Sequence, residues 1–107
     1  MIARVWHGYT KPEHADAYEA QLKPELLPGL STVAGYKGSC LLRRNLPGGE
    51  VEFITMILWE SIESVKAVAG PDYEVAVIPE ERRQYLSRFD ARASHFDVAA
   101  THGLMTR

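Results

Sequence analysis

The chain of 107 residues has 46% hydrophobic residues, 24% charged residues and a formal net charge of −2. This length fits one domain with a substantial core, and the ordinary globular composition argues against disorder. A net charge this close to zero gives no electrostatic reason to expect nucleic acid or an anionic membrane as a partner.

No apolar run in the sequence approaches the ~20 residues that a membrane-spanning helix needs. The N-terminal residues enter a strand-like pattern directly and lack the layout of a signal peptide. Cys40 is the only cysteine, so an intrachain disulfide is excluded, and we interpret it as a small buried hydrophobic residue on a strand. We therefore expect a cytoplasmic protein with no membrane partner.

The first predicted strand is Ile2–Tyr9. Alternate side chains of a strand point to opposite faces of its sheet. One face would therefore carry Ala3, Val5, His7 and Tyr9, and the other Ile2, Arg4, Trp6 and Gly8.

A helix is predicted to follow this strand. Thr10 can cap it, Pro12 suits its first turn, and Glu13 completes a capping box. Pro24 lacks an amide hydrogen and crowds the preceding turn, so we expect it to kink or end the helix. The apolar side of the helix carries Ala15, Tyr18 and Leu22 at helical spacing. A second helical piece would contain Leu26, Leu27 and Leu30.

A β-hairpin is predicted in the middle of the chain. Its first strand is Gly35–Arg44, in which Gly38 marks a bulge. Its second strand is Val51–Ser61, and the turn cluster Asn45–Gly49 joins the two.

The strand Val51–Ser61 is apolar on both faces through its middle. One face carries Val51, Phe53, Thr55, Ile57 and Trp59, and the other Glu52, Ile54, Met56, Leu58 and Glu60. The chain contains only enough predicted helix to cover one of these faces. We therefore expect a second subunit to cover the other.

The C-terminal half is predicted to contain two helices and one strand. The first helix is Ile62–Ala69, capped by the serine that precedes it. The segment Asp72–Ile78 has strand-like composition at a place where a loop would serve. The second helix runs from Pro79 to about Arg88, and the last strand is Ser94–Ala100. Residues 101–107 form a tail that we expect to be mobile or to serve an interface.

The predicted order is β-α-β-β-α-β, which is the ferredoxin-like arrangement of the α+β class. All sheet neighbours would be antiparallel, with the first strand and Val51–Ser61 central and the helices on one side. We predict a single domain over residues 1–107, with its core in residues 2–98.

Three local patterns on this framework resemble one known family. They are Trp6-His7-Gly8 on the first strand, Gly35-Tyr36-Lys37-Gly38 opening the second, and Glu52-Phe53 running to Trp59-Glu60-Ser61 before a helix. Together they resemble the antibiotic biosynthesis monooxygenase domain family, one branch of the dimeric α+β barrel proteins. These motifs mark a fold rather than a reaction.

The resemblance implies a homodimer whose sheets pack face to face, with a small-molecule pocket in each subunit between sheet and helices. Characterised members oxidise phenolic polyketide rings to quinones without metal, flavin or haem. A second branch degrades haem, and other members have no known reaction. The expected partners are therefore a second copy of the chain and a small aromatic or apolar ligand.

The haem-degrading branch uses an asparagine on the first strand, a tryptophan in the helix after the third strand and a histidine shortly beyond. Here the only asparagine is Asn45, in the hairpin turn. The helix Ile62–Ala69 has no tryptophan, and no histidine occurs between His14 and His95. The sequence therefore disfavours haem degradation.

His7 is the first candidate for a catalytic residue, because imidazole titrates near neutral pH. Oxygenation without a cofactor requires removal of a phenolic proton, and a base of this kind suits that step. With Tyr9 on the same face and His95 on a strand antiparallel to the first, we predict an acid/base cluster at one end of the pocket. This requires the His7 face to look toward the helices and the Trp6 face to look toward the partner subunit.

Each of these histidines also has a simpler interpretation. His7 could be a hydrogen-bonded structural residue, and His95 could face water. The histidines show no metal-ligand spacing, and the sequence lacks HExxH, GxGxxG and GxSxG motifs. We therefore predict no metal site and no cofactor.

Five aromatic residues could bind substrate, although packing in the core or at the dimer interface is the favoured explanation for each of them singly. They are Trp6, Trp59, Tyr36, Tyr73 and Phe89. Arg4 is unusual as a charge within a central strand, and we expect it to pair with Glu60 or Glu52 on the neighbouring strand, as a cross-strand or subunit-interface pair. Binding of a substrate anion is the less favoured alternative for this arginine.

Three functions remain open from the sequence. The first is cofactor-independent oxygenation of an aromatic or polyketide-like molecule, with His7 as general base. The second is a dimer that binds a small apolar molecule without turnover. The third is a structural dimer whose histidines only satisfy hydrogen bonds.

Overall fold

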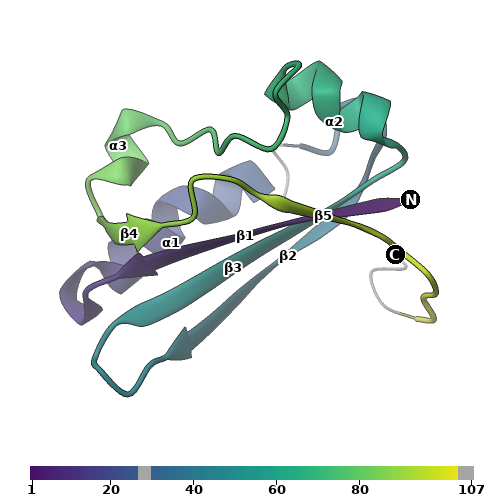
Figure 1. The fold of residues 1–107 in the computed structure, drawn as a ribbon. Helices are drawn as coiled ribbons and strands as arrows, with labels where there is room; N and C mark the ends of the chain where they lie inside the picture. The colour runs from purple at the N-terminus through teal and green to yellow at the C-terminus, as the bar shows by residue number, and fades with distance from the viewer. Residues whose placement is uncertain (27–29, 104–107) are drawn as a thin grey trace.

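The computed structural model describes residues 1–26 and 30–103. The described residues form eight helices and strands, which are labelled in Figure 1. They are β1 (Ile2–Thr10), α1 (Pro12–Leu26), β2 (Tyr36–Asn45), β3 (Val51–Trp59), α2 (Ile62–Ala69), α3 (Glu80–Arg83), β4 (Leu86–Phe89) and β5 (Ser94–Asp97).

The strands form one antiparallel sheet with β1 and β3 in its centre. β2 pairs with β3, while β4 and β5 share the other edge of β1. β4 lies beside Gly8–Thr10 and β5 beside Ile2–Val5, so a broken strand follows this edge (Figure 1). The fold is α+β and ferredoxin-like, as predicted.

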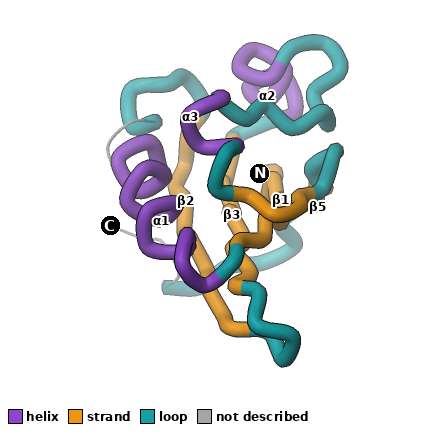
Figure 2. Tube along the Cα trace, turned by 90° about the vertical axis from the view of Figure 1, so that its left-hand side faces the viewer, coloured by secondary structure: helices purple, strands orange, loops and turns teal. Residues whose placement is uncertain are grey.

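The core lies between the sheet and α1 (Figure 2). The Tyr18 ring of α1 meets the Phe53 ring of β3 edge-on at 4.9 Å between centroids, and both side chains have no exposed surface. Burying an aromatic or large aliphatic side chain contributes about 1.5–3 kcal/mol each. The buried members of this core are Ala15, Tyr18, Leu22, Leu26, Val51 and Phe53.

The register between β1 and β3 determines which residues of β1 face the helices. Gly8 pairs with Phe53 and Arg4 with Ile57, and paired residues of antiparallel strands share a face. Arg4, Trp6 and Gly8 therefore lie on the helix side, and His7 lies on the opposite side. The expected orientation of His7 toward the helices is wrong. Alternation separates the two sets of residues, but only packing against α1 decides which set turns inward.

The predicted helix from Pro79 to Arg88 is also wrong. It ends at Arg83, and Leu86–Phe89 forms β4 instead. The backbone of this strand pairs with β1, whose edge would otherwise lack hydrogen-bond partners near Thr10. The last strand is shorter than predicted and stops at Asp97.

The structure decides two points that the sequence left open, the effect of Pro24 on α1 and the conformation of residues 72–78. α1 continues through Pro24 to Leu26. Pro24 removes one backbone hydrogen bond and crowds the preceding turn, and only two helical residues follow it. Residues 72–78 form a loop, held to the chain before β5 by a bridge between Val75 and Arg92.

The predicted cap of α1 is wrong, because Thr10 belongs to β1 and its buried Oγ1 has no hydrogen-bond partner in the described part of the chain. Two further local predictions are confirmed. The β2–β3 register shifts between Tyr36 and Gly38, as the predicted bulge requires. The Ser61 hydroxyl accepts a hydrogen bond from the Ser64 amide at 3.3 Å and caps α2, which ends at Gly70. The predicted helical piece through Leu27 and most of the C-terminal tail lie outside the described residues. No helix in the described part of the chain is long and apolar enough to cross a membrane.

Phe53→Ala should lower the free energy of unfolding by about 3–5 kcal/mol, because it removes a large side chain from the centre of the core. Urea unfolding at fixed protein concentration measures this loss. Val75→Ala, at a loop position whose residue is 41% exposed, should change it by less than about 0.5 kcal/mol. A loss below about 1 kcal/mol for Phe53→Ala would contradict the core described here.

Candidate functional site

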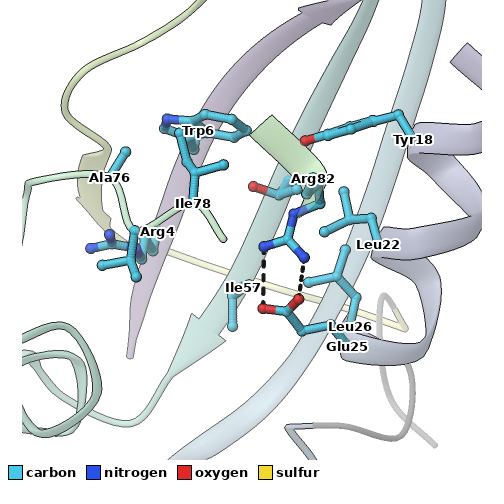
Figure 3. A pocket seen from close by; sticks show the side chains of 12 residues that line it. Arg4, Trp6, Tyr18, Leu22, Glu25, Leu26, Ile57, Ala76, Ile78 and Arg82 are labelled. Carbon is cyan, nitrogen blue, oxygen red and sulfur yellow. Dashed lines mark hydrogen bonds and ion pairs between the residues drawn. The ribbon is translucent and has the colours of Figure 1, made fainter. Parts of the chain in front are cut away.

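Two adjoining cavities lie between the helix side of the sheet, α1, α2 and the loop before α3. They have volumes of about 110 and 200 Å³ and share Arg4, Glu25, Leu26, Ile57 and Val77. Because they share these walls we treat them as one site, the helix-side cavity. Its size is near the lower end of the range of about 300–1,000 Å³ for small-molecule sites. The first part is shown in Figure 3.

Arg4 lies in the wall of both parts of the helix-side cavity. Its guanidinium donates to the main-chain carbonyls of Tyr73 and Val75, and its Nη1 lies 2.9 Å from Nε2 of His95. Since a guanidinium can only donate, Nε2 accepts, and the imidazole proton is on Nδ1. Burial lowers the pKa of Arg4, partly offset by the charge of Glu74. Burial and, second, the Arg4 charge lower the pKa of His95, and the hydrogen bond that Nε2 accepts from Arg4 requires a neutral ring.

The predicted ion pair of Arg4 with Glu60 or Glu52 is wrong. Glu52 lies on the opposite face of the sheet, and Glu60 is exposed beyond the end of β3. Among the residues that the structure describes, no carboxylate lies within ion-pair distance of Arg4. The sequence pointed to Arg4 as an unusual residue, because a charge is rare in an apolar stretch of a central strand.

Arg82 lines the first part of the helix-side cavity and forms an ion pair with Glu25. Both of its terminal nitrogens donate to the Glu25 carboxylate, drawn as dashed lines in Figure 3, and Nη2 lies 3.4 Å from Oε1. Arg82 is 8% exposed, so the two charges largely compensate each other at the cavity wall. Burial raises the pKa of the neighbouring Tyr18 to about 12, which keeps this phenol protonated. Sequence reasoning missed both Arg82 and Glu25.

Two tryptophans line different parts of the cavity. The Trp6 indole donates to the Asp90 carbonyl at 2.6 Å, and its ring passes so close to Gly8 that a Cβ there would lie 2.9 Å from it. Trp59 is 2% exposed and meets Tyr36 edge-on at 6.0 Å between ring centroids. The indole N–H of Trp59 is buried and has no hydrogen-bond partner in the described part of the chain.

The five aromatic residues proposed for substrate binding are divided by the structure. Trp6 and Trp59 line the helix-side cavity. Tyr36, Tyr73 and Phe89 line neither part of it. Phe89 packs against Trp6 with 6.0 Å between ring centroids. It therefore contacts a residue of the cavity wall without lining the cavity itself.

His7 and Tyr9 meet on the sheet face that carries no helix among the described residues. Nδ1 of His7 lies 2.9 Å from Oε2 of Glu52, and the Tyr9 hydroxyl donates to the same oxygen at 3.3 Å. Arg44 donates to the other oxygen of Glu52. Glu52 is 4% exposed, and these donors satisfy a carboxylate that is otherwise costly to bury. We call Glu52, His7, Tyr9 and Arg44 the sheet-side cluster.

His95 is not part of the sheet-side cluster. β5 pairs with the other end of β1, where His95 lies opposite Arg4. The predicted proximity of His95 to His7 is therefore wrong, and so is the placement of His7 in a pocket between sheet and helices. In the described ranges, no three His, Cys, Asp or Glu residues lie together in a way that could hold a metal ion.

Comparison with solved structures identifies the fold. A candidate antibiotic biosynthesis monooxygenase from Bacillus cereus matches with a TM-score of 0.68 and 16% identity, over 96% of this chain and 95% of that one. The haem degrader MhuD from Mycobacterium tuberculosis, with two haems in its active site, matches with a TM-score of 0.63 and 18% identity, over 96% of this chain and 100% of that one. A candidate antibiotic biosynthesis monooxygenase from Deinococcus radiodurans gives a TM-score of 0.58 and 11% identity, over 99% and 100%.

No protein-family model matches the sequence, and no curated protein matches it either. The structural likeness extends over nearly the whole of each chain, so it defines the class: an α+β domain with the fold of the antibiotic biosynthesis monooxygenase proteins. The family resemblance predicted from sequence is thus supported at the level of the fold.

Glu52→Gln should flatten the acid dependence of stability. Hydrogen bonds from His7 and then Arg44 hold the pKa of Glu52 below its usual 4.5, against the effect of burial. Ionised Glu52 therefore contributes stability above about pH 4.5, and this contribution is lost as pH falls through the lower folded value. The variant should also unfold about 1–3 kcal/mol more easily at pH 7, because a charged hydrogen-bond acceptor is lost.

Urea unfolding between pH 3 and 8 measures both effects. Glu63→Gln removes the same charge from an exposed position of α2 and should keep the wild-type profile. An unchanged acid slope in Glu52→Gln would show that the sheet-side cluster does not hold this charge.

Proposed function

We propose that the protein is a cofactor-independent monooxygenase that oxidises an aromatic or polyketide-like phenol in the helix-side cavity. One observation carries this proposal: the cavity is walled by apolar and aromatic residues, with a few polar groups placed among them, as small-molecule sites are. The fold shared with candidate monooxygenases supports the same reaction class by analogy.

The reaction needs no external reductant. A ring methylene flanked by phenolic rings reacts with one O₂ to give a ring carbonyl and one water. The methylene carbon loses two hydrogens and gains one oxygen atom, while the second oxygen leaves as water. The organic molecule loses four electrons and O₂ gains four, so the equation balances without flavin, haem or metal.

Residues of the cavity supply a proton acceptor and an apolar lining. Glu25 is the carboxylate in the lining of both parts of the cavity, and we assign to it the acceptance of the phenolic proton. Ile57 and Val65 present apolar surface that limits water at the electron-rich anion. Tyr18 stays protonated and does not compete for the proton. His7 has no part in this assignment, because it lies on the other face.

Haem degradation is not proposed. MhuD binds two haems in its active site, but this chain has no tryptophan in α2 and no histidine between His14 and His95. The tryptophan and the histidine that the family resemblance associates with haem are thus missing from these segments.

Binding without turnover is a second candidate function. It is favoured by one observation, that no histidine lines the helix-side cavity in the parts that the structure describes. The carboxylate of Glu25 is then the only proton acceptor in the described cavity lining for the phenolic proton, and it is already paired with Arg82.

Oxygen uptake with hydroxylated anthrones and naphthols tests the oxygenase proposal. The wild type should consume one O₂ for each quinone formed. Val68→Trp, at a half-exposed cavity position on α2, should fill the site and lower turnover by about tenfold or more. Val75→Trp, outside the cavity, is the matched control.

His7→Ala should keep turnover within about threefold of wild type. A loss of about a hundredfold, the scale for a missing general base, would return His7 to the mechanism. Absence of oxygen uptake with every substrate would favour binding without turnover.

We also propose that two copies of the chain associate through the sheet face opposite the helices. This face presents Leu42 and Phe96, which are 46% and 55% exposed, together with half-buried Val5, Ile54 and Met56. Exposed apolar side chains gathered on one face of a sheet are typical of an interaction site. A second sheet would cover it without disturbing the helix-side cavity.

Sedimentation at micromolar concentration should show a dimer for the wild type. Leu42→Glu places a charge on the edge-strand part of the proposed interface and should weaken dimerisation by about tenfold or more, because the carboxylate must be buried without a partner. Val75→Glu carries the same change on the other side of the molecule and should remain dimeric. A monomeric wild type would refute the association.

A further inference from the structure

We infer that the helix-side cavity selects an aromatic monoanion, a carboxylate or a phenolate, whose acid oxygen binds Arg4 and whose second acceptor binds the Trp59 indole. This inference rests on the proposed function in one respect, because it specifies the substrate class of the same cavity. It concerns binding alone, however, and is tested without turnover.

Arg4 differs from the other arginines in how its charge is balanced. Arg83 is exposed and lies over the Phe89 ring at 5.2 Å. Arg4 is half-buried, and its contacts are main-chain carbonyls and a neutral imidazole, none of which carries a negative charge. The arginines with a carboxylate partner within ion-pair distance are Arg43, Arg44, Arg82, Arg88 and Arg92.

Two carboxylates could balance the charge of Arg4, but each makes its ion pair with another arginine. Glu74 affects Arg4 through space but makes its ion pair with Arg92 at 3.1 Å. Glu25 lines the cavity with Arg4 but pairs with Arg82. The cavity wall therefore holds one guanidinium whose charge no contacting carboxylate compensates. An anion in the cavity would supply that compensation in a partly desolvated setting, where charge-assisted hydrogen bonds are strong.

Trp59 provides an independent observation. It is 2% exposed, lines the cavity, and has an indole N–H without a partner in the described residues. Buried N–H groups are nearly always hydrogen-bonded, so an orphan at a cavity wall points to a ligand atom. An indole N–H only donates, and its partner must be an acceptor.

The strand register makes Arg4 and Trp59 diagonal neighbours on the helix side of the sheet. Arg4 pairs with Ile57, and Trp59 follows two residues later on the same face of β3. Diagonal neighbours of this kind lie about 7–8 Å apart. Ile57 lies opposite Arg4 and two residues before Trp59, and it lines the cavity together with Val65 and Val68. An aromatic ring that carries two oxygen acceptors suits two donor residues set in this apolar lining.

Isothermal titration under anaerobic conditions tests the charge preference with 2-naphthoate and 2-naphthalenemethanol, which have similar shapes but differ in charge. The wild type should bind the naphthoate at least tenfold more tightly. Arg4→Met should remove the difference, Arg4→Lys should keep most of it, and the exposed control Arg83→Met should keep all of it. Equal affinity of the wild type for the two molecules would overturn the proposal, even if Arg4→Met failed to fold.

The second donor is tested with 6-methoxy-2-naphthoate and 6-ethyl-2-naphthoate, which differ in a single acceptor oxygen. The wild type should favour the methoxy compound by threefold or more, and Trp59→Phe should abolish this preference. A preference that survives Trp59→Phe would remove the indole from the site. Anion binding without oxygen uptake would refute the oxygenase proposal alone, while oxygen uptake without anion preference would refute this inference alone.

Discussion

The antiparallel register between β1 and β3 is the constraint on which the rest of the structure depends. It runs without a shift from Ile2 opposite Trp59 to Thr10 opposite Val51. Because Phe53 must pack beneath α1, every second residue of β1 is fixed on the helix side. Arg4 reaches the cavity as a result, and His7 is excluded from it. A register shift of one residue would exchange these roles.

The charged groups on the two faces of the sheet therefore differ in whether a partner of opposite charge contacts them. On the open face, the buried Glu52 is satisfied by His7, Tyr9 and Arg44, which makes the sheet-side cluster a self-contained network. On the helix side, the guanidinium of Arg4 is hydrogen-bonded but not neutralised. The first arrangement suits a structural role at the proposed dimer interface, and the second suits the binding of the proposed anionic ligand.

Sequence patterns predicted the strand order, the hairpin and the capped α2, because these features depend on local turn and cap chemistry. They did not predict which face of β1 turns inward, since alternation is symmetric until α1 is packed on one side. The segment after Pro79 reads as helix locally, but Leu86–Phe89 supplies hydrogen bonds to the edge of β1 instead. Glu25 and Arg82 escaped notice because their pairing joins elements 57 positions apart in sequence.

Methyl NMR on the wild-type protein provides the most direct test of the site's location. Ile54 and Ile57 lie three residues apart on β3 but face opposite sides of the sheet. If ligands bind in the helix-side cavity, addition of 2-naphthoate should shift the Ile57 and Val65 methyl resonances and leave those of Ile54 in place. Shifts at Ile54 with none at Ile57 would place the ligand beside the sheet-side cluster and contradict this account.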